Sequence, residues 1–128
     1  MGDMKITEHF DSKEFACKNG TKYPEAWIES RLRPLCNALE AIRARLGRPL
    51  KITSAYRTVT YNKKVGGALF SQHVQGRAVD IACTPKEVTN LYLIITDLIH
   101  KKVIPDGGIG VYRSWVHLDQ GPRRRWNG

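Results

Sequence analysis

The sequence contains no apolar run that approaches the length of a membrane span. A spanning helix needs about 20 consecutive, mostly apolar residues, and polar or charged residues interrupt every apolar stretch of this chain well before that length. Residues 1–8 are also too polar to supply the apolar region of a secretory signal peptide. We therefore expect a chain without a membrane span that is cytoplasmic as synthesised and that reaches any target outside the cell by another route.

Cysteine is scarce, with three residues of this type: Cys17, Cys36 and Cys83. An odd and sparse set does not make a disulfide framework, so we expect mainly buried thiols. The sequence leaves a bridge between Cys17 and Cys36 open. A chain of 128 residues is long enough to form one hydrophobic core without cross-links, and we expect a single domain over residues 1–128.

Acidic residues are few relative to basic ones, since 12 Asp and Glu against 21 Lys and Arg leave a net charge of +9. This charge predicts an anionic partner, such as nucleic acid or the anionic polymers and acidic peptides of a bacterial cell wall. The basic residues are spread along the chain except at residues 123–125, and no recognition helix or aromatic stacking motif accompanies them. We therefore expect no specific recognition of nucleic acid.

Two stretches have the periodicity of amphipathic helices. The first covers residues 30–47 and ends at a glycine, as helices commonly do. The second follows Thr84, which we expect to cap a helix with Pro85 at its first position and Glu87 completing a capping box. The predicted buried stripes are Leu32, Leu35, Leu39, Ile42 and Leu46 in the first helix, and Val88, Leu91, Ile95 and Leu98 in the second.

Strand patterns occur between and after these helices. The stretch 78–82 alternates, so that Val79 and Ile81 face the core while Asp80 lies on the opposite face. In the same way, the alternation in residues 115–119 places His117 and Asp119 together on one face. The predicted strands are residues 49–54, 78–82, 109–112 and 115–119, the last two joined as a hairpin. We expect an α+β fold with a small antiparallel sheet and the helices packed on one of its faces.

Two further segments carry expectations about the surface. Residues 58–72 form a long predicted loop with a short helix near residues 60–64, and loops of this length are usually functional. The tail, residues 120–128, is expected to close over an edge of the sheet, with Trp126 as its anchor.

The polar face of the predicted sheet has the residues of a metal site. Two neighbouring strands present Asp80 and His117 to one point, and the segment that enters the first strand supplies His73. Two imidazoles and one carboxylate suit Zn²⁺, and three protein ligands leave the fourth tetrahedral position for water. The same donor set also accepts other divalent metals.

The string Ser71-x-His73-x-x-Gly76-x-Ala78-x-Asp80, followed by a strand with His117, resembles the zinc-binding pattern of the M15 family of metallopeptidases. That family includes D-alanyl-D-alanine carboxypeptidases and peptidoglycan endopeptidases, and its fold is shared by the Hedgehog signalling domain. The resemblance extends through nearly the whole chain and implies a Hedgehog/DD-peptidase-like fold with the zinc site on the open face of the sheet.

The resemblance also implies an activity. A zinc peptidase of this kind would cut peptide bonds in peptidoglycan stem peptides or cross-links, as a carboxypeptidase or an endopeptidase, and would fit a phage or prophage lysin. Arg57, in the motif Ser54-x-Tyr56-Arg57, is implied to point into the site, where a guanidinium binds a substrate carboxylate or an oxyanion. The alternative from another class is a zinc-bearing wall-binding module without catalysis. A basic nucleic-acid binder without metal is the weakest of the three hypotheses.

The general base is where this sequence departs from the family pattern. Many relatives carry an acid three residues before the last metal histidine, or a second histidine two residues before it, whereas this chain has Ser114 and Trp115 there. Asp119 shares the face of His117 and is predicted to orient an imidazole or, as the less favoured alternative, to act as the base. Asp106 is a weaker candidate for the base.

Overall fold

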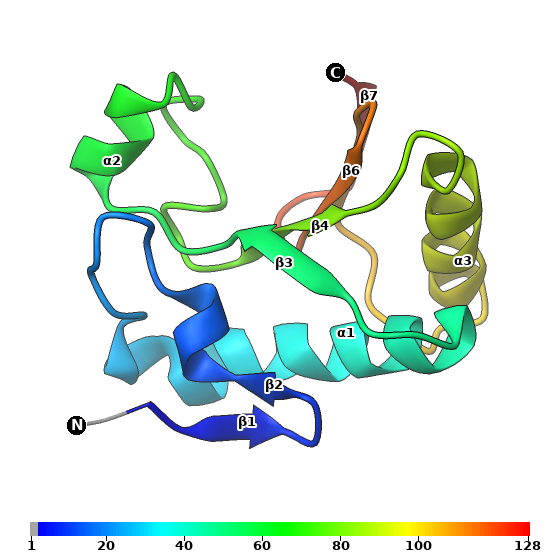
Figure 1. Ribbon diagram of the computed structural model, residues 1–128, viewed down its shortest axis with the longest axis horizontal. Helices are drawn as coiled ribbons and strands as arrows, with labels where there is room; N and C mark the ends of the chain where they lie inside the picture. The colour runs from blue at the N-terminus through cyan, green and yellow to red at the C-terminus, as the bar shows by residue number, and fades with distance from the viewer. Residues whose placement is uncertain (1–2) are drawn as a thin grey trace.

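A five-stranded sheet is the centre of the computed structural model, which describes residues 3–128 (Figure 1). The strand order is β3-β4-β6-β5-β7. The strands are β3 (Lys51–Ser54), β4 (Ala78–Ala82), β5 (Gly108–Val111), β6 (Trp115–Asp119) and β7 (Arg124–Asn127). The pairs β3–β4, β4–β6 and β5–β6 are antiparallel, and β5 pairs with β7 in parallel.

The expected α+β class, the antiparallel pairing of the site-bearing strands and the hairpin of residues 108–119 are confirmed. The tail covers the β5 edge of the sheet, as expected, and does so by adding a parallel strand. The amide of Arg124 donates to the carbonyl of Gly107, and the amide of Gly128 donates to that of Val111. The tail thereby pairs the backbone groups that β5 would otherwise expose as an edge strand.

The other elements lie around this sheet. They are β1 (Lys5–Thr7) and β2 (Phe10–Asp11), the 3₁₀ helices η1 (Ser12–Phe15) and η2 (Glu25–Trp27), the π-helix η3 (Ile28–Leu32), and the α-helices α1 (Arg33–Leu46), α2 (Val59–Lys64) and α3 (Val88–His100). Helices α1 and α3 pack against each other, and α2 lies at the opposite end of the molecule from α3 (Figure 1). The short helix expected near residues 60–64 is therefore present.

The long helices begin later than their sequence patterns predict. A π-helical turn precedes α1, and the regular helix starts at Arg33, with Pro34 in the first turn, where its missing amide hydrogen costs no helical bond. It ends at Gly47, which adopts a left-handed φ of 81°. The second predicted helix begins at Val88 instead of Pro85. The amide of Glu87 donates to the carbonyl of Thr84, so the chain closes a turn there before it becomes helical.

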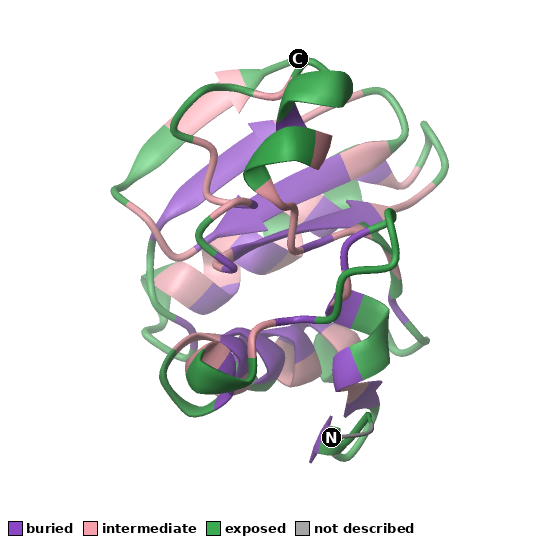
Figure 2. Ribbon diagram, turned by 90° about the vertical axis from the view of Figure 1, so that its left-hand side faces the viewer, coloured by how far each residue is buried: buried purple, intermediate pink, exposed green. Residues whose placement is uncertain are grey.

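The core lies between the helices and one face of the sheet. Strand residues Val79, Ile81, Val116 and Leu118 and helix residues Leu39, Ile42, Leu91 and Ile95 belong to one buried apolar cluster. Strands β4, β5 and β6 are largely buried, whereas β3 and β7 have only intermediate and exposed residues and α2 is mostly exposed (Figure 2). Metal-site candidates Asp80 and His117 alternate with these core residues, so their side chains leave the sheet on the face away from the core.

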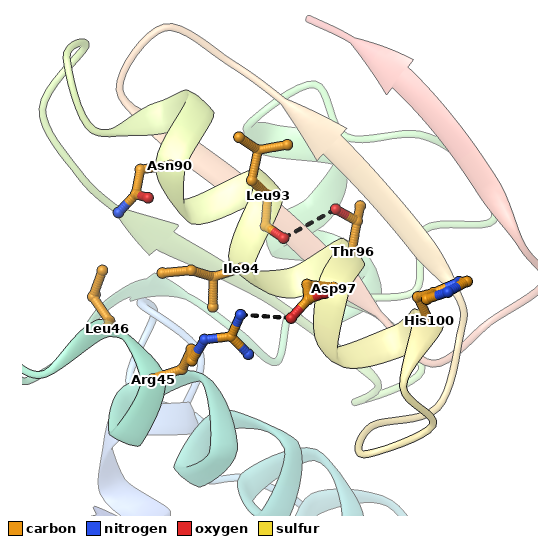
Figure 3. Close-up of a pocket in the computed structure, with 8 residues that line it drawn as sticks. All are labelled: Arg45, Leu46, Asn90, Leu93, Ile94, Thr96, Asp97 and His100. Atoms are coloured by element: carbon orange, nitrogen blue, oxygen red, sulfur yellow. Dashed lines mark hydrogen bonds and ion pairs between the residues drawn. The ribbon is translucent and has the colours of Figure 1, made fainter.

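On the helical side, a surface hollow lies between α1 and α3 (Figure 3). Across it Arg45 Nη2 donates to Asp97 Oδ2 at 2.5 Å, which joins the two helices. None of the residues that line this hollow belongs to the predicted metal site.

Among residues 3–128, no helix combines the length and the apolar character needed to cross a membrane. Cys17, Cys36 and Cys83 are free thiols, so the bridge left open by the sequence is not formed. Cys17 and Cys36 are buried, as expected, and burial raises the pKa of the Cys36 thiol to about 12.

Replacement of Leu39 by alanine tests the core. Leu39 is fully buried in α1, and its truncation leaves a cavity that should lower the free energy of unfolding by about 2–5 kcal/mol. The matched control is Leu93→Ala on α3, because Leu93 is 56% exposed and its loss should change stability by less than about 0.5 kcal/mol. Urea titration measures both values, and equal effects would contradict this description of the core.

Candidate metal centre

The three predicted metal ligands meet at the open face of the sheet. Asp80 and His117 stand directly opposite each other in the antiparallel pair β4–β6. Asp80 Oδ1 lies 3.0 Å from His117 Nδ1 and 3.3 Å from His73 Nε2. One donor atom from each residue lies within 4.8 Å of the others, and all three residues are buried. This is a spacing at which one metal ion can contact all three side chains.

In each imidazole, the nitrogen that faces away from Asp80 lies next to a hydrogen-bond acceptor. His73 Nδ1 lies 2.7 Å from the carbonyl oxygen of Ala55, and His117 Nε2 lies 2.8 Å from Asp119 Oδ2. A carbonyl or a carboxylate only accepts, so both of these ring nitrogens carry hydrogen and donate. In the neutral imidazoles, His73 Nε2 and His117 Nδ1 therefore direct lone pairs towards Asp80.

This arrangement fits a divalent cation such as zinc. With both imidazoles neutral, two lone pairs meet the Asp80 carboxylate, and a cation among them satisfies all three groups: a proton in the metal-free protein, or a divalent metal ion in its place. Zinc accepts imidazole nitrogen and carboxylate oxygen together. A hydrogen-bonded acceptor on the far nitrogen is the usual setting of a metal-binding histidine, because it fixes the tautomer and the ring orientation.

The pKa shifts have the same physical origin as this convergence. Burial alone would raise the pKa of the Asp80 carboxyl, but the hydrogen bonds and charges of His117 and His73 outweigh it and hold that pKa well below its usual range. Burial alone would lower the pKa of His117, but hydrogen bonds to Asp119 and Asp80 outweigh it and raise that pKa. The site thus favours a positive charge beside Asp80.

Asp119 is fully engaged by donors. Its Oδ1 accepts from the amides of Gly108 (3.1 Å) and Gly121 (2.9 Å), and its Oδ2 accepts from His117 Nε2 and from Arg124 Nη2 (2.9 Å). Burial would raise the pKa of Asp119, but the hydrogen bonds from His117, Gly121 and Gly108 and the charge of His117 lower it overall. The side chain is 0% exposed. A carboxylate held in this way suits the orientation of His117 better than proton transfer from water.

Arg57 lies beside the cluster, as the sequence predicts. Its Nη2 is 3.8 Å from Asp80 Oδ2, and its backbone amide donates to the carbonyl of His73. The guanidinium also donates to Ser54 Oγ and to Asn62 Oδ1, each at 3.3 Å. Only 17% of the side chain is exposed, so the cation is held at the edge of the cluster rather than free in solvent.

Asp106 lies elsewhere. Its carboxylate pairs with Arg123 and Arg125 and accepts from the amide of Gly107. These hydrogen bonds, that of Arg125 above all, lower the pKa of Asp106. It is not among the residues that line the cleft over the metal cluster, so the geometry does not favour it as a base.

A cleft of about 620 Å³ opens over the cluster. Loop residues Phe70 and Gln72 line one part of it, and Tyr112, Trp115 and Trp126 line another. The rings of Tyr112 and Trp115 are stacked with centroids 4.4 Å apart, and Trp126 Nε1 donates to the Tyr112 hydroxyl. Residues of the predicted loop 58–72 therefore line the cleft over the cluster, and so do the aromatic side chains of Tyr112, Trp115 and Trp126.

The turn that carries His73 is held by residues from the N-terminal part of the chain, Tyr23, Trp27 and Arg31. The Tyr23 hydroxyl donates to the carbonyl of Gly76 at 2.6 Å, and Arg31 donates to that of Gln75. Gly76 has a φ of 68°, and a Cβ there would lie 2.8 Å from atoms of both Tyr23 and Trp27. Glycine is required here by both conformation and space.

Sequence reasoning missed three residues of this region. Asn62, a buried side chain of α2, donates to the carbonyl of Ala68 and accepts from Arg57. Arg124 and Trp126 reach the cluster only because the tail forms β7. No spacing rule identifies Asn62, and residues 124–127, Arg-Arg-Trp-Asn, have no apolar–polar alternation that would have signalled a strand.

Comparison with known proteins agrees with this geometry. A protein-family model described as Peptidase M15 matches residues 8–119. The protein is therefore of the metallopeptidase class, and the chain belongs to the peptidase M15 family. No curated protein matches the chain.

Substitution of Gly76 by alanine tests the support of His73. Gly20→Ala is the matched control, because Gly20 also has a positive φ, of 94°, but has nothing within 4 Å of the added Cβ. The control should lose about 1–2 kcal/mol of stability from backbone strain alone. Gly76→Ala should lose about 1–3 kcal/mol more, because the methyl group displaces Tyr23 and Trp27.

The accompanying measurement is zinc affinity, which should fall for Gly76→Ala and stay unchanged for Gly20→Ala. Equal zinc affinity and equal denaturation midpoints for the two variants would show that the crowding around Gly76 does not position His73.

Proposed function

We propose that this protein is a zinc-dependent peptidase that hydrolyses peptide bonds in the stem peptides or cross-links of bacterial peptidoglycan, with residues 1–128 as one catalytic domain. The observation that supports it most is the convergence of His73 Nε2, His117 Nδ1 and the Asp80 carboxylate beneath a cleft, with the far nitrogen of each ring already bonded. The match to the peptidase M15 family supports the same reading.

In this proposal His73, Asp80 and His117 hold the zinc ion. When bound, zinc would supply Lewis acidity, which lowers the pKa of a water molecule to about 7 and polarises the peptide carbonyl. The three side chains are buried and held from behind, so their donor atoms are preorganised for one ion.

Arg57 supplies the positive charge that the reaction needs beside the metal. Its guanidinium is fixed by Ser54 and Asn62 and lies at the edge of the cleft. From there it would donate hydrogen bonds to the oxygen that gains negative charge as the carbonyl is attacked, or to a carboxylate of the substrate. Either contact orients the peptide relative to the metal.

Asp119 would act through His117. It accepts the Nε2 hydrogen of His117 and has no exposed surface, so it would hold the ring and not take the proton of the attacking water. Asp80 and Asp119 are the carboxylates among the described residues that line the cleft, and both are engaged.

That shortage of a free carboxylate supports the second candidate, a zinc-bearing module that binds wall peptides without cutting them. In either case the net charge of +9 suits anionic wall polymers. Action on the wall would follow lysis-assisted release or delivery as a virion component.

Metal removal separates the two candidates. The purified protein should contain roughly one zinc per chain and should release peptide amines from isolated peptidoglycan. A chelator should abolish this release, and added zinc should restore it. Bound zinc without hydrolysis at any pH would favour the binding module, whereas failure to bind zinc at all would refute both.

Alteration of a proposed ligand should have the same consequence as metal removal. His73→Ala should lower turnover by more than about 100-fold, since the loss of a mere hydrogen-bond partner of a ligand costs about 10–100-fold in metal affinity. His100→Ala is the control, because His100 is exposed at the end of α3 and outside the cleft. Zinc content and peptide release should be unchanged in the control.

Replacement of Arg57 tests electrostatic assistance separately from metal binding. Arg57→Lys keeps the charge but loses the planar fork of donors, and Arg57→Ala loses both. Turnover should fall by about 10²–10³-fold in Arg57→Ala, by less in Arg57→Lys, and zinc content should stay at the wild-type level. Arg113→Ala, which removes an exposed charge outside the cleft, should remain active. Full turnover by Arg57→Ala would contradict this role.

A further inference from the structure

The tail strand β7 brings two side chains against the metal centre from outside the family match, which ends at residue 119. These side chains are Arg124 and Trp126, and both line the cleft. In the parallel pair with β5, Arg124 lies opposite Gly108 and Trp126 lies opposite Gly110.

Arg124 shares one oxygen atom with His117. Its Nη2 donates to Asp119 Oδ2 at 2.9 Å, and the same oxygen accepts from His117 Nε2 at 2.8 Å. The other oxygen of Asp119 is occupied by two backbone amides. Arg124 therefore supplies the positive charge of a permanent cation to a fully buried carboxylate, and a buried charge that loses its partner is strongly destabilised.

Arg124 also reaches His117 by a second route. Its guanidinium carbon lies 4.8 Å from the ring centroid of Trp126, a cation–π distance. The Trp126 ring in turn lies against the His117 ring, with centroids 5.1 Å apart. One side chain thus touches two of the groups that surround the imidazole.

The neighbouring strand is shaped to admit this arrangement. A Cβ at Gly108 would lie 2.4 Å from Asp119 Oδ2, and a Cβ at Gly110 would lie 2.4 Å from the Trp126 indole. Gly108 therefore leaves room for the Asp119 carboxylate, and Gly110 leaves room for the Trp126 indole.

From these contacts we propose that Arg124 is a positioning residue for His117. It holds Asp119 Oδ2 and the Trp126 ring, and through them it keeps His117 Nδ1 directed at Asp80, where the metal would bind. The inference rests on the metal centre of the proposed function. It also assigns a role to the basic run 123–125, in which Arg123 and Arg125 pair with Asp106 instead.

The test compares Arg124→Ala with Arg123→Ala. Arg123 is the matched control because it is the adjacent arginine, is 69% exposed against 50% for Arg124, and forms an ion pair with Asp106 away from the cleft. Zinc affinity is measured by competition with a chromogenic chelator. Arg124→Ala should bind zinc about tenfold more weakly, and Arg123→Ala should stay within about twofold of wild type.

Two further readouts separate positioning from a general loss of structure. Added guanidinium ion should restore part of the zinc affinity of Arg124→Ala and none of that of Gly76→Ala, because only the first lacks a guanidinium. In the metal-free protein, at a pH high enough to leave His117 neutral, the ¹⁵N shifts of His117 should report hydrogen on Nε2 in the wild type and a mixture of the two tautomers in Arg124→Ala. Arg124→Lys keeps the charge, so its zinc affinity should lie between those of the wild type and Arg124→Ala. This variant remains informative if Arg124→Ala does not fold.

The outcomes distinguish this inference from the proposed function. Wild-type protein that binds no zinc refutes the metal centre, and the His117 shifts of the metal-free variants still decide whether Arg124 positions the ring. Zinc affinity and His117 shifts that are the same in Arg124→Ala and Arg123→Ala overturn the inference and leave the metal centre standing. A raised KM with unchanged zinc affinity would also overturn it, because it would make Arg124 a substrate contact.

Discussion

The in-register pairing of Asp80 with His117 across β4 and β6 is the constraint on which the site depends. Facing residues of an antiparallel pair keep their side chains about 5 Å apart on one side of the sheet. This separation between facing Cβ atoms is short enough for one metal ion to contact both an imidazole and a carboxylate. A shift of one residue in this register would send His117 to the core and Val116 or Leu118 to the cleft.

The rest of the fold restricts how the three donor side chains can turn. Ala55, at the end of the neighbouring β3 segment, accepts from His73, and Asp119 accepts from His117. The turn that carries His73 is fixed by the Tyr23 bond to Gly76. A hydrogen bond to the distant Ala55 thus sets the direction of the His73 ring, and a local one to Asp119 sets that of His117, whereas the ligands by themselves would leave both rings free to rotate.

Charge in this protein is distributed more specifically than its total suggests. The net charge of +9 is that of the whole chain, yet the basic run at residues 123–125 is paired with Asp106 and Asp119. Arg57 lies against Asp80 in the same way. Arg57 and Arg124, which line the cleft, are therefore tied to the buried acids Asp80 and Asp119.

The sequence by itself determined the α+β class, the three candidate ligands and the face on which they lie, because strand alternation and helix periodicity are local properties of the chain. The resemblance of the Ser54-x-Tyr56-Arg57 motif to the family pattern added Arg57 as a candidate. The tertiary structure alone decided that Asp119 is saturated by donors, that Asn62 holds Arg57, and that Arg124 and Trp126 reach His117. The contacts of Arg124 and Trp126 join residues whose approach depends on sheet order, and a parallel strand such as β7 leaves no local pattern that names its partner.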